Sequence, residues 1–449
     1  MFLLPHMPFW FYLLKIYLSS RDIPAVYITL LQVLSLLITA AIFLLLHIRP
    51  YWDRSKMAAR LKIMYGGHRL LKLCRYGILF QIVFYLFLLL GNFSPFPLLR
   101  ENLTLCIGDF ICCFIYYYLL IVNSCIRILC TCRRLGIIKR LIVIFFLFTP
   151  VVNLFLLRYL SKKSKEEFDQ ELCRFENRKD RDGSFPCATK YPIIMLHGIG
   201  FRDFQYLNYW GRIPKELARY GAMVYYGHQE AWGTIEHNAS IIQDKIQEIL
   251  RENQCEKVNI IAHSKGGLDA RYLISGLHME AQVASLTTIS TPHRGSELIN
   301  YLDRLPDSLY RFLASWFDKS FRHIGDQTPD CYHASKQLSP AFCREFNEKY
   351  PDAAEVYYQS YATAMKHPLG DSLLTIPYIL MRLAGIKEND GLVAVDSAKW
   401  GVYKETFIST GRRGISHGDI IDLKREDYKG FDVLEAYVKI VRELKEKGY

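Results

Sequence analysis

One stretch, Val258–Tyr272, limits the possible folds of this chain more than any other; it reads V-N-I-I-A-H-S-K-G-G-L-D-A-R-Y. A short β-branched run ends in a turn from Ala262 to Gly266, and a helical pattern without a breaker follows at once. A strand, a sharp turn and a helix of this kind lift a serine oxygen clear of a sheet and place it at the positive end of the helix. Ala262 and Gly266 are small enough to let the strand and the helix approach closely. The pattern therefore predicts that Ser264, at the tip of the turn, is a nucleophile.

Beyond Lys190 the chain alternates short β-branched runs with amphipathic helices, which indicates an α/β domain with a mainly parallel sheet over residues 189–449. The expected strands are Pro192–Leu196, Ala222–Tyr226, Val258–Ala262, Val283–Ile289, Ala354–Tyr361 and Thr406–Ser409. The expected helices are Ile213–Arg219, Thr234–Asn253 and Leu268–Gly276. Residues 161–188 are charged and poor in branched aliphatic side chains, so we expect a linker there, or a helix followed by a linker.

Residues 1–160 have the character of a membrane domain. Four apolar runs, near 23–48, 77–99, 103–126 and 138–160, reach the roughly 20 residues that span a hydrocarbon core. These runs lack polar faces, which argues against the alternative of buried helices in a soluble domain. We therefore predict an all-α transmembrane domain of about four helices.

One acidic residue, Asp109, lies inside the third apolar run. Ionisable residues within membrane spans often mark a proton or substrate site. A residue this close to a helix end can also reach the membrane interface. The sequence leaves both interpretations open.

Basic residues cluster between the apolar runs: Arg49–Arg75 holds eight Lys/Arg and Arg127–Arg140 holds five. Clusters of this kind mark cytoplasmic loops, so we expect an integral protein of the cell membrane with its α/β domain outside the cytoplasm. Four cations at 158, 162, 163 and 165 argue the other way, but the two larger clusters outnumber them. Residues 1–165 hold 20 Lys+Arg and 4 Asp+Glu, whereas the remainder has a small acidic excess. The basic charge therefore gives no reason to expect nucleic acid as a partner.

A serine nucleophile needs a histidine to take its proton and a carboxylate to hold the tautomer of that histidine. On a sheet of this type the three follow in the order serine, acid, histidine. His417 lies past the last expected strand in a loop of small residues and is the predicted base; the alternative is a surface histidine. Asp390, in a turn before an apolar run, is the predicted acid, with Asp396 and Asp352 as rivals.

The oxyanion of a reacting ester needs two preorganised backbone N–H groups. One is expected from Lys265, the residue after the nucleophile. The other is expected from Ile199, in the H-G-I-G-F segment directly after the first strand, because its flanking glycines let the backbone turn toward a substrate. His197 in this segment precedes the serine, so we interpret it as a buttress of the loop rather than as the base.

The order of these motifs resembles the calcium-dependent bacterial triacylglycerol lipases, which belong to the α/β-hydrolase superfamily. The resemblance spans roughly residues 190–422 and leaves the membrane part uncovered. The segments that carry it are Lys190–Ile194, His197-Gly198, Ala262–Gly267, Thr291–Ser296, Lys336–Ser339, Phe346–Pro351 and Asn389–Val393. It implies an α/β-hydrolase fold and the site residues already chosen, namely the triad Ser264, Asp390 and His417 and the oxyanion donors Ile199 and Lys265.

The same resemblance implies a structural calcium ion, held by one aspartate upstream of the acid and by another two residues after the histidine. Asp371 and Asp419 stand at those positions, and the backbone carbonyls of Leu423 and Asp427 would complete a site of oxygen ligands. The family often has a polar residue where Leu423 stands, and Asp422 and Lys424 alter the local charge. The alternative interpretation of the two aspartates is a helix N-cap and a surface acid.

Residues 300–342 occupy the place where lipases of this kind carry a mobile lid. A helical apolar stripe runs through the segment, formed by Leu302, Leu305, Leu309, Phe312, Leu313, Trp316 and Phe317. A lid that opens on lipid would expose such a stripe, whereas a permanently packed helix would bury it. The two large aromatic side chains, Trp316 and Phe317, favour the lid.

The sequence as a whole predicts a membrane-anchored serine esterase or lipase that hydrolyses carboxylic esters of lipids, of the triacylglycerol or phospholipid type, through an acyl-enzyme. Its expected partners are a lipid or ester substrate and the bilayer. One alternative is a lipid acyltransferase or remodelling enzyme with the same triad. A second alternative is a catalytically silent membrane scaffold that keeps the fold.

Overall fold

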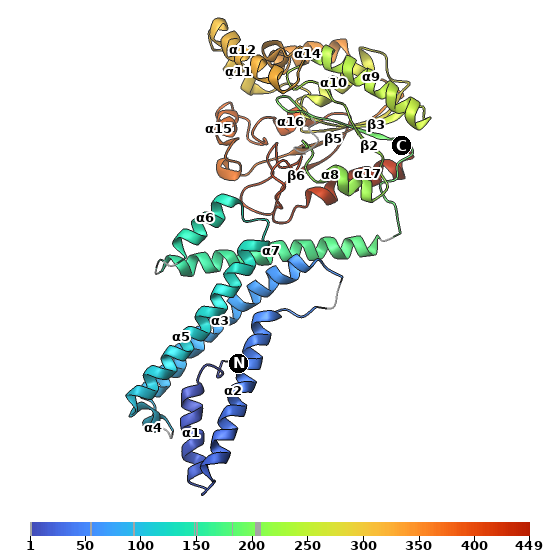
Figure 1. Cartoon of the computed structure of the whole chain (residues 1–449). Coiled ribbons are helices and arrows are strands. Elements are labelled where there is room, and N and C mark those ends of the chain that lie inside the picture. Colours follow the sequence, from blue (N-terminus) through green and yellow to red (C-terminus); the bar gives the residue numbers. More distant parts are fainter. Residues whose placement is uncertain are drawn as a thin grey trace. The chain divides into compact units, whose positions relative to one another are not determined.

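The computed structural model describes residues 2–449 apart from 54–55, 93–94, 148, 150, 182 and 203–207. The chain divides into two compact units, Met1–Asp180 and Arg181–Tyr449 (Figure 1). The first unit consists of helices, and the second contains a parallel sheet covered by helices. The two units are described separately below.

The helices of the first unit follow the apolar pattern of the sequence. Their bounds are α1 Met7–Ser19, α2 Ala25–Ile48, α3 Ala59–Leu90, α4 Phe96–Arg100, α5 Leu103–Thr131, α6 Ile137–Phe146 and α7 Val152–Asp180. Among the described residues, α2, α3 and α5 are long and apolar enough to cross a membrane. Helices α2 and α5 match the first and third expected spans, 23–48 and 103–126. Helix α3 overlaps the second expected span, 77–99, only in part, because it begins at Ala59 and ends at Leu90.

The fourth expected span, 138–160, is not one continuous helix. Helix α6 ends at Phe146 and α7 begins at Val152, so neither described helix combines the length and hydropathy of a span. A proline at position 150 explains the interruption, because proline disfavours the helical conformation in the residue before it. Val151 moreover has a left-handed φ of 65°. Helix α7 then continues to Asp180, which makes 161–188 a helix followed by a linker.

Helices α3 and α5 pack closely because small residues of α3 face large ones of α5. A Cβ at Gly77 would lie 2.4 Å from the ring of Tyr117, and a Cβ at Gly67 would lie 2.8 Å from Ile128. Without a hydrophobic driving force between helices in lipid, close backbone approach of this kind supplies much of the packing energy. The α3–α5 pair is therefore the centre of the first unit.

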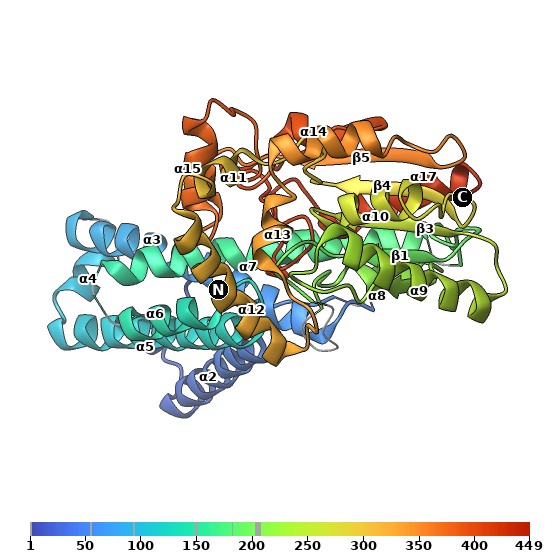
Figure 2. The same cartoon turned by 90° about the horizontal axis from the view of Figure 1, so that it is seen from above.

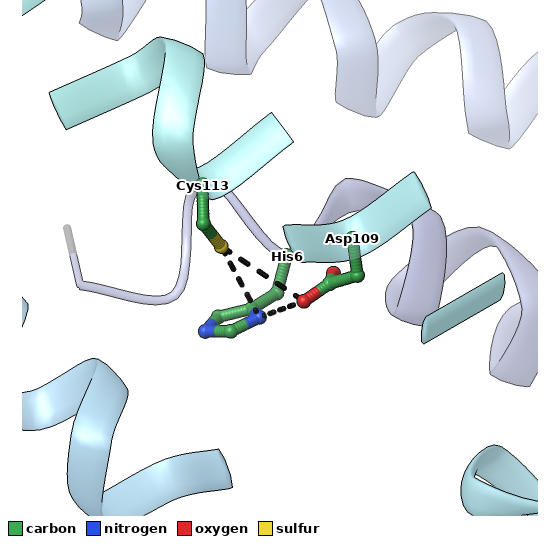
Figure 3. Close-up of side chains that lie close together, drawn as sticks. All are labelled: His6, Asp109 and Cys113. Atoms are coloured by element: carbon green, nitrogen blue, oxygen red, sulfur yellow. Dashed lines mark hydrogen bonds and ion pairs between the residues drawn. The ribbon is translucent and has the colours of Figure 1, made fainter. Parts of the chain in front are cut away.

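A buried polar cluster lies beside this pair (Figure 3). The Asp109 carboxylate is fully buried, and its Oδ2 lies 2.6 Å from His6 Nδ1 and 2.8 Å from the Tyr85 hydroxyl, which donates to it. Cys113 Sγ lies 3.8 Å from the same oxygen and 3.7 Å from His6 Nδ1. Asp109 thus points into the unit, toward side chains that hydrogen-bond to it, and not out of the helix end.

The three groups lie within 4.8 Å of one another, close enough to be considered as metal ligands. Two tetrahedral ligands roughly 2.0 Å from a zinc ion would stand about 3.3 Å apart. The 2.6 Å between His6 Nδ1 and Asp109 Oδ2 is instead the length of a direct hydrogen bond. We interpret the cluster as a hydrogen-bonded group that makes a buried carboxyl tolerable among apolar helices.

In the second unit all six strands pair in parallel, in the order β2-β1-β3-β4-β5-β6. Their bounds are β1 Ile193–Leu196, β2 Val224–Tyr226, β3 Val258–His263, β4 Val283–Ile289, β5 Tyr357–Thr363 and β6 Val402–Phe407. Helices α8 Ile213–Arg219 and α17 Val433–Glu446 cover one face of the sheet. Helices α9 Ile235–Asn253 and α10 Gly266–Ser275 cover the other (Figures 1 and 2).

Burial on both faces explains why the strands read as continuous apolar runs. In β1, Ile193 and Met195 pack in the core under α8 and α17, while Ile194 and Leu196 pack in the core under α9 and α10. All six expected strands and all three expected helices of this unit are present, so the predicted α/β class is confirmed. Strand β5 lies two to three residues later than expected, over Tyr357–Thr363. Strand β6 is displaced further: it runs over Val402–Phe407 instead of Thr406–Ser409, because this edge strand is half-buried and lacks a continuous apolar run.

The remaining helices surround the carboxyl ends of the strands. They are α11 Glu297–Leu302, α12 Asp307–Ile324, α13 Cys331–Lys336, α14 Pro340–Lys349, η1 Pro368–Gly370, α15 Thr375–Leu383 and α16 Val395–Ala398. Helix α12 packs on α13 and Trp232 through Tyr310 and Ala314. The apolar stripe expected in the lid segment lies on its other side, where Phe312 and Trp316 are 68% and 63% exposed.

The polar cluster of the first unit yields a stability prediction. Tyr85→Phe removes one hydroxyl and leaves Asp109 with one donor fewer, so we expect the free energy of unfolding to fall by about 1–3 kcal/mol. Thermal unfolding of the full-length protein in detergent measures the change. Tyr118→Phe, at an exposed position of α5, is the matched control. Equal melting temperatures for the two variants would contradict the proposed importance of the cluster.

Candidate active site

The elbow predicted around Ser264 is present between β3 and α10. Ser264 has a left-handed φ of 55°, a strained conformation that an L-residue keeps only where the surrounding structure imposes it. Glycines provide the necessary space: a Cβ at Gly266 would lie 2.5 Å from the His197 carbonyl oxygen, and one at Gly198 would lie 2.7 Å from Ser264 Cβ. The serine is therefore held at the carboxyl end of the central strand β3, against the loop that follows β1.

Asp390 and His417 are joined directly. His417 Nδ1 lies 2.8 Å from Asp390 Oδ2, and the His417 backbone N–H donates to the Asp390 carbonyl over 3.0 Å. Burial alone would raise the pKa of Asp390, but the charge and hydrogen bond of His417 and two backbone N–H groups hold that pKa below its ordinary value. An ionised Asp390 keeps the proton of the imidazole on Nδ1 and leaves Nε2 as the basic nitrogen.

Three further donors fix the Asp390 carboxylate. The Leu392 and Val393 N–H groups donate to Oδ1 over 3.0 and 2.8 Å, and the Thr363 hydroxyl donates to Oδ2 over 2.9 Å. The rival acids lie elsewhere: Asp396 pairs with Lys399, and Asp352 accepts from the Trp400 indole. Of the three candidates, Asp390 is the one that contacts the histidine.

His263 is a neighbour of both Ser264 and His417. The imidazole rings of His263 and His417 lie 4.4 Å apart, and His263 directly precedes Ser264. Within the described residues no hydrogen bond joins the Ser264 hydroxyl to His417. In hydrolases without substrate this contact is often long, and it shortens in the substrate complex.

A tyrosine that no motif marked organises the other side of the serine. The Tyr209 hydroxyl lies at hydrogen-bond distance, 2.7 Å, from His263 Nδ1 and accepts from the Gly198 N–H over 3.1 Å. Burial, together with the neighbouring charge of His417, lowers the pKa of His263 well below its ordinary value, so this imidazole is neutral. Tyr209 thus links the turn of the nucleophile to the loop after β1.

The two expected oxyanion donors are free to act. Among the described residues, neither the Ile199 nor the Lys265 backbone N–H donates a hydrogen bond. The Lys265 side chain points away, because its Nζ pairs with buried Asp269 over 2.6 Å. His197 is buried, with its ring nitrogens 2.8 and 3.0 Å from the Gly198 and Gln229 carbonyl oxygens. These contacts support its interpretation as a buttress of the loop.

The two aspartates expected at a calcium site are buried, and other residues already contact them. Asp371 Oδ1 lies 2.7 Å from Lys424 Nζ, and its Oδ2 accepts from the Ser416 hydroxyl over 2.7 Å. Asp419 accepts from Arg413 Nη2 through both oxygens, over 3.0 and 2.8 Å. Calcium requires six to eight oxygen ligands at 2.3–2.6 Å. With all four carboxylate oxygens occupied by donors, this set does not fit the ion, and no step below depends on it.

Thr363 is the positioning residue that the sequence pattern concealed. It is the last residue of β5, two residues beyond the expected end of that strand, and its hydroxyl also lies 2.7 Å from the Ser290 hydroxyl after β4. Functional side chains of parallel sheets gather at the carboxyl ends of the strands. If the sequence pattern had predicted that β5 ends at Thr363, this residue would have been a candidate for the site.

One family profile and three lipase sequences match this chain. Residues 192–352 match the profile of the palmitoyl protein thioesterase family. Triacylglycerol lipase 2 of Saccharomyces cerevisiae is 31% identical over 261 residues, which cover 54% of this chain and 75% of the yeast protein. A triacylglycerol lipase of Pseudarthrobacter phenanthrenivorans is 32% identical over 182 residues, which cover 37% of this chain and 56% of that lipase. A triacylglycerol lipase of Pseudomonas fragi is 25% identical over 296 residues, which cover 58% of this chain and 98% of that lipase.

Two solved structures match part of this chain at low sequence identity. The mature lipase BlEst2 of Bacillus licheniformis has a TM-score of 0.42 and 19% identity, and covers 56% of this chain and 92% of its own. The metagenomic carboxyl esterase MGS0156 has a TM-score of 0.45 and 17% identity, and the match covers 57% of this chain and 76% of the esterase.

The contacts of Thr363 lead to a test of the Asp390 environment. Thr363→Val removes a hydrogen bond to a buried carboxylate, so we expect a fluorophosphonate probe to label Ser264 about 10 to 100 times more slowly. Thr363→Ser keeps the hydroxyl and is expected to retain the labelling rate. The rates are measured on the full-length protein by gel fluorescence. Equal rates for the valine and serine variants would show that the hydroxyl does not position the acid.

Proposed function

Because the chain belongs to the triacylglycerol lipase family and is an ester-hydrolysing enzyme, we propose that it is a membrane-anchored serine esterase acting on carboxylic esters of lipids. The observation that carries this proposal is the buried Asp390–His417 hydrogen bond at the edge of the sheet that also holds the Ser264 elbow. A serine, a histidine and an acid in this order are the machinery of acyl transfer.

In the proposed mechanism Ser264 Oγ attacks the ester carbonyl while His417 Nε2 takes its proton. Asp390 holds the Nδ1–H tautomer and stabilises the imidazolium that forms. The Ile199 and Lys265 N–H groups donate to the oxyanion of the tetrahedral intermediate. His417 then gives the proton to the leaving alcohol, and the acyl group remains on Ser264. Water, deprotonated by the same histidine, attacks this acyl-enzyme and releases the carboxylic acid.

Two exposed apolar surfaces support a lipid as the substrate. One is the stripe of α12, and the other lies on and before α15, where Leu373, Ile376 and Leu383 are each at least 70% exposed. Exposed apolar surface of this kind on a hydrolase marks a contact with lipid or protein. We propose residues 300–342, which include α12, as a lid that turns its stripe toward lipid.

The first unit supplies the proposed anchor. Helices α2, α3 and α5 have the length and hydropathy of membrane spans. We propose that the basic segments 49–75 and 127–140 face the cytoplasm. An enzyme domain on the other side of the membrane then requires a fourth crossing after residue 140, within the interrupted segment that holds α6 and α7. An enzyme tethered in this way meets its substrates at the bilayer surface.

Active-site labelling tests the proposed chemistry. The full-length protein in detergent is expected to react with a fluorophosphonate and to hydrolyse a long-chain ester, and Ser264→Ala is expected to lose both by at least about 10³-fold. Ser275→Ala, at the far end of α10, is the control serine. Absence of labelling in the wild type would favour the scaffold alternative. Analysis of the products with a lipid alcohol present separates hydrolysis, which yields free acid, from transfer to the alcohol.

The stripe on α12 gives a second test. Phe312→Ser/Trp316→Ser removes apolar surface worth about 2–3 kcal/mol per side chain when buried, so we expect at least a tenfold loss of activity on phospholipid vesicles carrying a long-chain ester. Activity on a short soluble ester is expected to stay within twofold of wild type. Ser315→Ala on the same helix is the control. Equal losses on both substrates would contradict a role of the stripe in lipid contact.

A further inference from the structure

Two basic side chains stand at the two ends of the loop that carries His417. Arg413 lies four residues before His417, and Lys424 lies seven residues after it. Arg413 pairs with Asp419, and Lys424 pairs with Asp371, which lies outside the loop. These are the two aspartates at which the resemblance to calcium-dependent lipases implies the ion.

We propose that Arg413 and Lys424 replace the calcium ion as built-in cations, and that they act as positioning residues which hold the His417 loop without any bound metal. The inference rests on the proposed function only in assigning His417 as the base. Its structural part, that the loop is held by side-chain cations, stands independently of the reaction.

The charges of the site balance without an ion. Asp371 and Asp419 carry two negative charges when ionised, and the guanidinium and the ammonium supply two positive charges, the same amount as one calcium ion. Both carboxyl side chains are at most 3% exposed, while the two basic side chains are 30% and 28% exposed. An added calcium ion would bring two more positive charges beside Arg413 and Lys424, with only the exposed Glu426 carboxylate, 3.7 Å from Arg413 Nη1, to offset them among the described residues, which is unfavourable in a largely buried place.

The hydrogen-bond partners of the two aspartates also leave no open ligand position. Tyr428 donates to Asp419 Oδ1 over 2.6 Å, and the Ser416 N–H donates to Asp419 Oδ2 over 3.0 Å. When these two contacts are added to the two ion pairs and to the hydrogen bond from the Ser416 hydroxyl, each of the four carboxylate oxygens accepts at least one hydrogen bond. To bind calcium the site would have to break these contacts and move both basic side chains aside.

Ser416 transmits this restraint to the base. Its hydroxyl donates to Asp371 and its N–H to Asp419, so the residue directly before His417 is held by both ion-paired carboxylates. On the other side, the His417 N–H is bound to the Asp390 carbonyl. The backbone of the base is therefore fixed from both directions, and the cations keep the two carboxylates in place.

The test compares the full-length protein in detergent in EGTA and in millimolar calcium chloride, by melting temperature and by hydrolysis of a soluble ester. The wild type is expected to show the same melting temperature, kcat and KM in both. Lys424→Ala is expected to lower kcat at least tenfold with an unchanged KM, and Lys424→Arg to retain kcat. Lys424→Ala/Arg413→Ala frees both carboxylates, so we expect calcium to raise its melting temperature and kcat, and Asp371→Asn in this background to abolish the rise.

The outcomes separate this inference from the proposed function. A wild type that melts lower or loses activity in EGTA would overturn the replacement of calcium while leaving the esterase intact. A double variant that folds but gains nothing from calcium would overturn it as well. If the double variant does not fold, the wild-type comparison and the split between kcat and KM in Lys424→Ala decide. A wild type that is stable in EGTA but hydrolyses no ester would refute the function and not the cations.

Discussion

The buried carboxylate of Asp390 needs hydrogen-bond donors, and several segments of the second unit are placed so that they supply them. An ionised acid taken out of water costs several kcal/mol unless its oxygens are fully hydrogen-bonded. The donors come from three separate places: the end of β5, the turn at 392–393 and the loop of His417. Gly414 lets that loop approach, since a Cβ there would lie 2.4 Å from the Ala364 carbonyl oxygen. The hydrogen bonds to this one carboxylate thus hold His417 and the end of β5 beside Asp390.

The first unit meets the same problem only in part. Asp109 is as deeply buried as Asp390, and His6 and Tyr85 bond to its Oδ2, but among the described residues its Oδ1 has no hydrogen-bond partner. No strained turn or glycine loop surrounds this carboxyl; the close packing of α3 on α5 brings Tyr85 into reach. The contrast is instructive, because a His–Asp pair by itself is not a catalytic centre. At Asp390 the pair lies near a serine elbow, and this is the arrangement on which the proposed function depends.

The sequence predicted most of the second unit because its signals are local. An apolar run buried on both faces marks a strand, and the elbow around Ser264 is confined to five consecutive residues. Local sequence patterns do not predict contacts between segments that are distant in the chain. Tyr209 lies in no motif, Thr363 falls past the expected strand end, and the pairing of Lys424 with Asp371 joins residues from different loops. In the first unit, Pro150 was visible in the sequence, yet hydropathy alone favoured one helix where there are two.

The orientation of helix α12 has a consequence for how the protein behaves in solution. The helix holds its place through Tyr310 and Ala314 and leaves its largest aromatic side chains in water. The exposure of each of these side chains to water is unfavourable. Contact with an amphiphile, or with the same surface of a second molecule, would remove that exposure. The second unit therefore carries an apolar surface that favours self-association. Even without residues 1–180, we expect it to need detergent or lipid to remain monodisperse.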